Sequence, residues 1–254
     1  MTFFQTIAVA FAMFSAIPTP QFDWTEKNMR YALCAFPLVG VVCALCWLVL
    51  AFLPLPDFLR GTLLCLAPLA VTGGIHLDGY ADTCDALASH GNTVKKQEIL
   101  KDPHCGAFAV IRLCVYFVLY LALCVTLTPS LRAVICAGLG FILSRTLSGW
   151  AVATLPLAKN TGLAHAFAAA ADRKIVRLVL AVLAAVLVIV QIAVGGIIGF
   201  AMTLAAGLTL WRYAHAAKTQ FGGISGDLAG WFLQECELWQ LAALVFCQLL
   251  EGYL

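Results

Sequence analysis

Three aspartates at helical spacing are the residues of this sequence best suited to chemistry. Asp78, Asp82 and Asp85 follow the pair Gly73-Gly74 at positions i, i+4 and i+7, so a helix would carry all three on one face. Like charges this close repel, and each is costly at the end of a membrane segment. A bound cation relieves the repulsion, and carboxylate oxygens favour Mg²⁺, which binds a few carboxylates together with substrate phosphates. The alternative is a solvated acidic helix face.

Polar residues close to this cluster extend the predicted site. His76 is a metal ligand, a general base, or a hydrogen-bonded residue at the start of the helix. In the following segment 98–106, Pro103 is expected to end a short helix and to leave Asp102 at a turn. Lys101 beside it supplies positive charge suited to phosphates. An ordinary loop at the membrane surface explains the segment equally well.

A glycine-rich turn forms the third candidate. Glycines before a helix N-terminus expose backbone N–H groups toward an anion, and the helix dipole adds to the attraction. The residues expected to hold a phosphate in this way are Gly222, Gly223, Ser225 and Gly226. Asp227 follows them, and it either caps the next helix or joins the metal site.

Two charged residues are expected within the membrane. Arg145 follows Ser144 in an apolar run, and its planar fork binds a carboxylate or a phosphate bidentately. An ion pair with Glu237 or Asp85 and direct contact with substrate are both open. Glu237 lies within the last apolar run, where a buried carboxylate is rarely present for packing.

Together these residues predict metal-assisted chemistry on a phosphate or diphosphate. In such transfers a divalent cation neutralises the bridging oxygens, and one carboxylate or histidine accepts the proton of the attacking hydroxyl. No serine or cysteine with a base beside it is apparent as a nucleophile.

The amino-acid composition indicates what class of protein carries these residues. Of 254 residues, 63% are apolar and 11% charged, against about half and a quarter in a soluble domain, so a soluble globule is excluded. The net charge of +2 is too small for a nucleic-acid-binding protein. We therefore predict an all-α polytopic membrane bundle, formed as a single domain by residues 1–254.

Apolar runs of about 20 residues give the predicted spans. Six or seven membrane helices are expected, with a short interfacial or re-entrant helix at the N-terminus that ends at Pro18. The expected spans are 31–53, 62–75 (short, entering the membrane next to a polar pocket), 108–127, 131–155, two within 175–214 that divide near Gly195-Gly196, and 228–250.

The distribution of basic residues predicts the orientation. Alternating spans place the segments 18–30, 76–107, 156–174 and 212–227 on one side. Twelve lysines and arginines lie in or beside these segments: Lys27, Arg30, Lys95, Lys96, Lys101, Arg112, Lys159, Arg173, Lys174, Arg177, Arg212 and Lys218. The other side holds only Arg60 and Arg132. The positive-inside rule therefore makes the first side cytoplasmic. The acidic loop 76–107 and the glycine-rich loop 212–227 are then cytoplasmic, and the C-terminus lies opposite.

The sequence resembles a known family, the cobalamin-5′-phosphate synthases, also called adenosylcobinamide-GDP ribazoletransferases. The stretch GGIHLDGYADTCD (73–85) is similar to the signature G-G-x-H-L-D-G-x-A-D-T-x-D of that family. Further similar blocks follow in order along the chain: EILKDPHCG (98–106), Ser144-Arg145, Gly162-Leu163, and 222–227 with Gln234 and Glu237. The early residues Phe14 and Ile17-Pro18-x-Pro20 also fit.

The resemblance implies an Mg²⁺-dependent enzyme in the bacterial inner membrane. It implies that adenosylcobinamide-GDP is joined to α-ribazole, or to α-ribazole 5′-phosphate, with release of GMP. The metal ligands would be Asp78, Asp82 and Asp85, joined by Asp227, and one of the three or His76 would act as the base. Lys101, Asp102, Arg145 and Glu237, together with the turn 222–226, would contact substrate. A homo-oligomer is compatible with this interpretation.

Two other classes of membrane protein are weighed against this one. A CDP-alcohol phosphotransferase also uses clustered aspartates, but its signature has Ala-Arg after Asp-Gly, whereas Asp78-Gly79 is followed by Tyr80-Ala81-Asp82. A cation-coupled transporter relays ions through intramembrane carboxylates. No clear inverted repeat supports it, and the acids lie in loops on one side.

Overall fold

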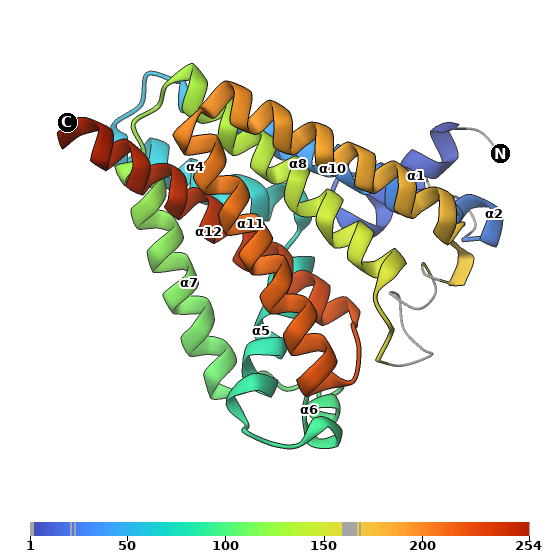
Figure 1. Cartoon of the computed structure of the whole chain (residues 1–254). Coiled ribbons are helices and arrows are strands. Elements are labelled where there is room, and N and C mark those ends of the chain that lie inside the picture. Colours follow the sequence, from blue (N-terminus) through green and yellow to red (C-terminus); the bar gives the residue numbers. More distant parts are fainter. Residues whose placement is uncertain (1–2, 21, 23, 159–166, 168, 254) are drawn as a thin grey trace.

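Helices make up the regular structure of the described residues. The computed structural model describes residues 3–20, 22, 24–158, 167 and 169–253. Figure 1 shows the helices α1 (Phe3–Phe14), α2 (Glu26–Met29), α3 (Ala32–Ala51), α4 (Asp57–Thr72), α5 (Ile75–Ala88), α6 (Thr93–Ile99), α7 (Ala107–Thr126), α8 (Leu131–Thr154), α10 (Arg173–Gly195), α11 (Ile197–Ala216) and α12 (Gly226–Tyr253). A π-helical turn, η1 (Ala217–Phe221), continues α11. The predicted all-α architecture is confirmed.

Five helices of the described chain are long and apolar enough to cross a membrane, and a bent pair adds a sixth. The five are Ala32–Ala51, Ala107–Thr126, Leu131–Thr154, Arg173–Gly195 and Ile197–Phe221, and the pair is α4 with α5. The predicted division at Gly195-Gly196 is confirmed, and so is a short N-terminal helix, which ends at Phe14 rather than at Pro18. These helices account for five or six of the six or seven expected.

Helix α12, which covers the expected span 228–250, is not among the described helices whose length and composition suit a membrane span. Its 28 residues correspond to about 42 Å of helix, which is long enough. It carries Gln234, Glu237 and Gln240 on buried positions, where they face other helices. These polar residues make α12 too polar to be recognised as a span by hydropathy. They are tolerated because they are buried against other helices.

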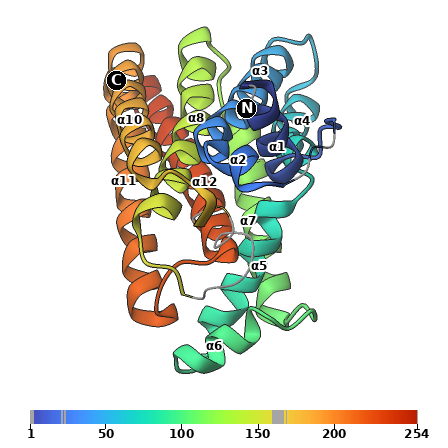
Figure 2. The ribbon, with the colours of Figure 1, turned by 90° about the vertical axis from the view of Figure 1, so that its right-hand side faces the viewer.

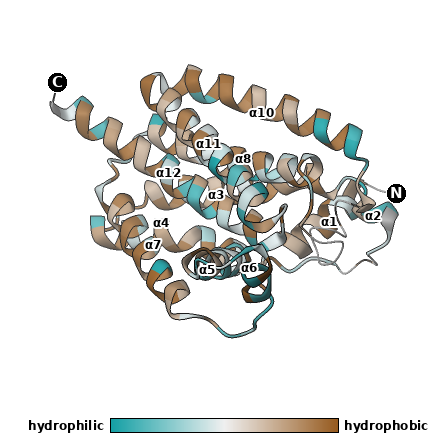
Figure 3. Cartoon of the chain, turned by 60° about the horizontal axis from the view of Figure 1, so that its bottom comes forward, coloured by the Kyte–Doolittle hydropathy of each residue, from teal (hydrophilic) through white to brown (hydrophobic). Residues whose placement is uncertain are grey.

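Helix α10 carries an exposed apolar stripe of the kind that suits contact with lipid. Leu178, Val182, Val186 and Ile189 recur every three or four residues and are each about half exposed or more. In Figure 3 the length of α10 is mostly hydrophobic, with hydrophilic residues at the end where it begins. Such a stripe is stable in hydrocarbon and unfavourable in water.

Helix α8 lies at the centre of the bundle and packs on α3, α10 and α12. Its contact with α3 is close because Gly40 has no side chain. A Cβ built at Gly40 would lie 2.5 Å from the carbonyl oxygen of Phe141. Small residues that let backbones approach are the usual basis of helix packing in membranes. In Figure 2, α8 stands between the α10–α11 pair and the group formed by α3 and α4.

A sharp bend between α4 and α5 creates the acidic end of the molecule. The two helices meet at 95°. Gly73 (φ +65°) and Gly74 (φ +83°) both adopt left-handed conformations, which side chains disfavour, so the Gly-Gly pair permits the bend. Figure 1 shows α5 and α6 at the bottom, away from the end that holds the C-terminus and the α7–α8 turn.

The short helix α2 is tied to the start of α10 by an ion pair. Arg30 Nη2 lies 2.7 Å from Asp172 Oδ2, and Asp172 also accepts a hydrogen bond from the backbone N–H of Ile175 at 3.3 Å. The hydrogen bond from Arg30 lowers the pKa of Asp172 below its ordinary value. Asp172 therefore remains charged and caps α10 at neutral pH.

Arg145 and Glu237 form a buried ion pair between α8 and α12. Arg145 Nη1 lies 2.5 Å from Glu237 Oε1, and the two side chains are 0% and 2% exposed. Ser144 Oγ donates to the same carboxylate oxygen at 3.1 Å, and Arg145 Nη1 also donates to the carbonyl oxygen of Phe141 at 2.9 Å. The sequence left open an ion pair with Glu237, an ion pair with Asp85 and direct contact with substrate. In the structure Arg145 pairs with Glu237.

Removing one member of this pair leaves the other charge buried without a partner. We expect Arg145→Met to destabilise the protein by roughly 3–5 kcal/mol. The measurement is the thermal unfolding midpoint of the purified protein in detergent. The double variant Arg145→Met/Glu237→Met is expected to recover part of the loss, because neither charge then remains. A single variant as stable as the wild type would show that the pair is not formed.

Candidate active site

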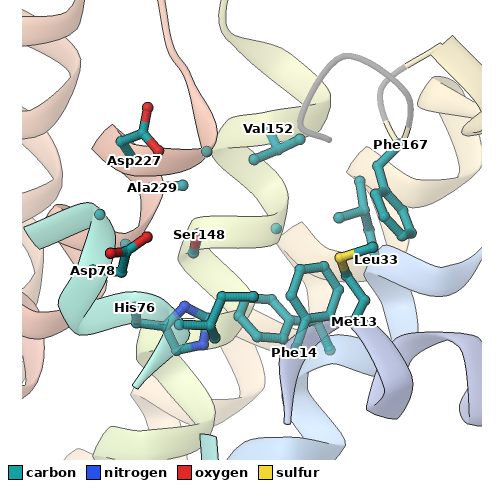
Figure 4. A pocket seen from close by; sticks show the side chains of 16 residues that line it. Met13, Phe14, Leu33, His76, Asp78, Ser148, Val152, Phe167, Asp227 and Ala229 are labelled. Atoms are coloured by element: carbon teal, nitrogen blue, oxygen red, sulfur yellow. The ribbon is translucent and has the colours of Figure 1, made fainter. Parts of the chain in front are cut away.

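A cavity of about 200 Å³ lies where α5 and the start of α12 meet α1, α3 and α8. One part of its wall is polar and includes His76, Asp78, Ser148 and Asp227. The rest is apolar: Met13, Phe14, Leu33, Phe36, Val152 and Phe167. Figure 4 shows the carboxylates of Asp78 and Asp227 at one end and Phe14, Leu33 and Phe167 toward the other. The cavity is therefore acidic at one end and apolar at the other.

The three aspartates of the predicted cluster share one face of α5, as their spacing indicated. Asp78 is exposed and Asp82 and Asp85 are partly buried, whereas the intervening Tyr80 and Thr83 are buried. Asp227 reaches the same region from α12, since it lines the same cavity as Asp78 and its backbone lies against Gly79 of α5. Two segments about 140 positions apart in sequence thus contribute to one acidic region.

Close backbone contact between α5 and α12 brings these acids together. A Cβ built at Gly79 would lie 2.7 Å from the Cα atom of Asp227, and one built at Gly230 would lie 2.8 Å from the carbonyl oxygen of His76. Neither position has room for a side chain. The two glycines therefore set the distance between Asp78 and Asp227.

His76 is buried beside the apolar part of the cavity. It is 7% exposed, its ring centroid lies 5.7 Å from that of Phe36, and its Nε2 atom has no hydrogen-bond partner. A buried polar atom without a partner costs free energy and calls for an explanation. In Figure 4 the imidazole lies among the side chains that line the cavity.

The far end of the acidic face meets the start of α7. The carboxylate of Asp85 lies against the Cα atom of Gly106, so closely that a side chain at that position would displace it. Gly106 belongs to the block EILKDPHCG, which the sequence singled out. Part of that block therefore contacts the aspartate cluster.

Lys101 and Asp102, from the same block, lie elsewhere. Both are exposed in the loop between α6 and α7, and neither lines the cavity. Asp102 Oδ1 accepts a hydrogen bond from the backbone N–H of His104 at 3.0 Å and lies 2.7 Å from His104 Nδ1. The backbone hydrogen bond, followed by that of the imidazole, lowers the pKa of Asp102. The structure does not bring these residues to the cavity.

The glycine-rich turn is held by its own backbone hydrogen bonds. The N–H of Gly223 donates to the carbonyl oxygen of Ala217 at 2.9 Å, and that of Ile224 donates to Pro156 at 2.8 Å. Ser225 Oγ caps α12 by accepting from the N–H of Leu228 at 3.2 Å. Any phosphate contact by this turn therefore has to come from the start of α12, at Gly226 and Asp227.

Helix α6 connects the two loops that carry the motifs. Lys96 is buried and its Nζ donates to Gln220 Oε1 at 2.6 Å, while Gln97 Nε2 donates to the carbonyl oxygen of Phe221 at 2.7 Å. Each of these two hydrogen bonds joins residues that are 124 positions apart in the sequence. The block 98–106 and the turn 222–227 are therefore parts of one end of the bundle.

Arg145 and Glu237 are separate from the cavity. Neither lines it, and each neutralises the other inside the bundle. This arrangement favours the ion-pair alternative over direct substrate contact. Gly162 and Leu163, which also carried the resemblance, lie outside the described residues, as does Lys159.

Sequence reasoning did not assign the apolar wall of the cavity to the site. Phe36, Val152 and Phe167 lie in apolar runs and have no polar atoms that would distinguish them from core residues. Phe14 alone gave a signal, because it belongs to the early block that carried the resemblance. Only the three-dimensional arrangement of α1, α3 and α8 reveals the wall.

Comparison with known proteins identifies the family. Residues 6–245 match the family model described as cobalamin-5-phosphate synthase. The chain belongs to the cobalamin-5-phosphate synthase family. The aspartate cluster, the glycine-rich turn and the cavity all fall within the part of the chain that matches this synthase model.

Several curated relatives share the name adenosylcobinamide-GDP ribazoletransferase. One from Lachnoclostridium phytofermentans is 40% identical over 252 residues, which are 98% of this chain and 96% of the relative. One from Geobacillus sp. (strain WCH70) is 32% identical and covers 86% of each chain. One from Clostridium perfringens (strain SM101) is 29% identical over 91% of this chain and 93% of the relative. No solved structure matches the chain.

The glycine contact between α5 and α12 can be tested by adding one methyl group. We expect Gly79→Ala to lower the free energy of unfolding by about 1–3 kcal/mol, because the methyl group would overlap the backbone of Asp227. The thermal unfolding midpoint in detergent measures the effect. Gly207→Ala in α11 is the matched control, since nothing lies within 4 Å of the added methyl group there. Equal midpoints for the two variants would contradict the close contact.

Proposed function

We propose that the protein is an Mg²⁺-dependent adenosylcobinamide-GDP ribazoletransferase. It joins adenosylcobinamide-GDP to α-ribazole, or to α-ribazole 5′-phosphate, and releases GMP. The observation that carries the proposal is the gathering of Asp78, Asp82, Asp85 and Asp227 at one end of the bundle, in a chain that belongs to the cobalamin-5-phosphate synthase family.

The chemistry of the donors supports Mg²⁺ as the metal. Carboxylate oxygens are hard ligands, and Mg²⁺ usually binds one or two of them together with waters and substrate phosphates. Within the described residues no three His, Cys, Asp or Glu side chains form a ready-made metal-binding group. In this proposal the aspartates hold the cation only when the diphosphate supplies further oxygen ligands. Bound there, Mg²⁺ would neutralise charge on the phosphate oxygens.

The reaction needs a nucleophile, a proton acceptor and a stabilised leaving group. A bond forms between the 3′-hydroxyl oxygen of ribazole and the phosphorus nearest the corrinoid, and the bond from that phosphorus to the bridging oxygen breaks. GMP leaves with the bridging oxygen. The hydroxyl proton passes to a carboxylate of the cluster. Asp78 and Asp227 line the cavity directly, whereas Asp82 and Asp85 lie further along the same face.

The remaining charged residues have supporting roles in this proposal. Lys101 is exposed near the acidic end and is available to attract the diphosphate. The N-terminus of α12 presents N–H groups and a helix dipole to a phosphate. Arg145 and Glu237 hold α8 against α12 and so keep Asp227 in place beside α5.

We also propose that the aspartate end of the bundle faces the cytoplasm of a bacterial cell. Twelve of the fifteen lysines and arginines lie in or beside the segments predicted on that side, and such segments remain cytoplasmic when membrane helices insert. Both substrates are polar, so an opening toward the cytoplasm would make the site accessible to them.

The proposal predicts which components are required for the release of GMP. Purified protein supplied with adenosylcobinamide-GDP, α-ribazole and Mg²⁺ should form GMP and a ribazole-linked corrinoid in equal amounts. Leaving out Mg²⁺ or α-ribazole should stop the reaction. GMP without α-ribazole would indicate a hydrolase, and no GMP with all components present would contradict a transferase and favour a transporter.

Aspartate-to-asparagine changes test the cluster itself. We expect Asp78→Asn, Asp82→Asn and Asp85→Asn to lower kcat roughly a hundredfold or more, because metal-assisted charge stabilisation supplies several kcal/mol. Asp57→Asn is the matched control, since Asp57 starts α4 and pairs with Arg60. Each variant should elute as a folded protein in size-exclusion chromatography. Wild-type-like activity in any two of the three would refute the metal assignment.

A further inference from the structure

The geometry points to the apolar part of the cavity as the binding site for the aromatic base of the ribazole substrate, with His76 Nε2 as the donor to the free ring nitrogen of that base. This inference rests on the proposed function and adds to it by assigning one substrate to one pocket. It also assigns His76 to substrate recognition rather than to metal binding or proton transfer.

The shape and lining of the cavity select a flat apolar ring. Phe14 lies 4.2 Å from Phe36 and 5.6 Å from Phe167, measured between ring centroids, so three aromatic side chains form one continuous wall. Aromatic rings pack favourably on such walls in offset or edge-to-face arrangements. Leu33 and Val152 complete the apolar surface.

The size of the cavity excludes the corrinoid. Sites that enclose a drug-sized ligand have volumes of about 300–1,000 Å³. A cavity of about 200 Å³ holds a bicyclic base and leaves the much larger corrin macrocycle outside. The corrinoid and its diphosphate then approach the acidic end from the surface, where Asp78 is exposed.

The polar groups inside the cavity distinguish the benzimidazole base of ribazole from the guanine of adenosylcobinamide-GDP. Guanine carries hydrogen-bonding groups along most of its edge, and leaving them unpaired in an apolar pocket is costly. Away from the two carboxylates, the polar side chains of the wall are His76 and Ser148. The base of ribazole has a single free ring nitrogen, which is an acceptor. The buried Nε2 of His76, which has no partner, can donate one hydrogen bond to it.

The direction of the cavity agrees with the chemistry. A base seated among Phe14, Leu33 and Phe167 would direct its attached ribose toward Asp78 and Asp227 at the other end (Figure 4). The hydroxyl that attacks phosphorus belongs to that ribose. One binding mode therefore both recognises the base and delivers the nucleophile to the aspartates.

The first experiment removes the ring nitrogen from the substrate and the imidazole from the protein. Steady-state kinetics would compare the ribosides of benzimidazole and of indole, in which a C–H replaces the acceptor nitrogen. With the wild type we expect the KM of the indole riboside to be about tenfold higher. With His76→Phe the two KM values should become equal, while the KM of adenosylcobinamide-GDP stays unchanged.

Two outcomes of this experiment would overturn the assignment of His76. One is a His76→Phe variant that still discriminates against the indole riboside. The other is a change in the KM of adenosylcobinamide-GDP with no change in that of the riboside, which would place the guanine or the corrinoid at His76. In both cases the wild type would still release GMP, so the proposed function would stand.

The second experiment fills the cavity. We expect Val152→Phe to raise the KM for α-ribazole about tenfold and to affect the smaller imidazole riboside less, which a general folding defect would not do. Val245→Phe is the matched control, because Val245 lines a different apolar cavity between α7 and α12. Equal losses for both ribosides, or no loss for α-ribazole, would overturn the assignment. Absence of GMP release by the wild type would instead refute the proposed function.

Discussion

Four carboxylates share one end of this bundle because glycine lets two helices touch backbone to backbone. Gly79 on α5 and Gly230 on α12 leave no room for a side chain between the helices. Asp78 and Asp227 are consequently held at the same cavity although their charges repel. Packing thus stabilises an arrangement that electrostatics opposes, and a cation would remove the opposition. The remainder of the site is arranged around this contact.

The membrane bundle supplies the rigidity that the contact needs. Helix α12 is polar for a membrane helix, and its polar groups are satisfied by neighbours. Gln234 accepts a hydrogen bond from the hydroxyl of Tyr116 at 2.5 Å, and Glu237 pairs with Arg145. These bonds fix α12 against α7 and α8. The start of α12, with Ser225 as its cap and Asp227 in its first turn, is therefore held in one position relative to α5.

Much of the fold could be predicted from sequence because the hydropathy of a run and the residues that end a helix act within a few neighbouring positions. The run 131–155 and the break at Gly195-Gly196 illustrate this, since apolar length and glycine each determine structure within a few residues. The spacing of Asp78, Asp82 and Asp85 likewise fixed their common face. Hydropathy alone does not identify the last helix as a span, because the partner of Glu237 is set by packing against α8 and not by the segment that contains Glu237.

The parts of the site that escaped prediction depend on contacts between distant segments. Nothing local indicates that Val152 or Phe167 lines a cavity, or that Lys96 is buried against Gln220. The turn 222–227 was expected to present its N–H groups to an anion, yet the hydrogen bonds of Gly223 and Ile224 are made within the protein. Tertiary hydrogen bonding of this kind is not encoded in the glycine pattern itself.

The response of stability to Mg²⁺ tests the central claim most directly. The thermal unfolding midpoint of the wild type and of Asp82→Asn would be measured with adenosylcobinamide-GDP present over a series of Mg²⁺ concentrations, with NaCl holding the ionic strength constant. The account predicts that Mg²⁺ raises the midpoint of the wild type, because a cation that binds the folded state stabilises it. It further predicts that Asp82→Asn is the more stable protein without Mg²⁺ and responds less to it. A wild-type midpoint independent of Mg²⁺, together with no gain in stability from Asp82→Asn, would contradict the claim that these carboxylates form a repulsive cluster that awaits a cation.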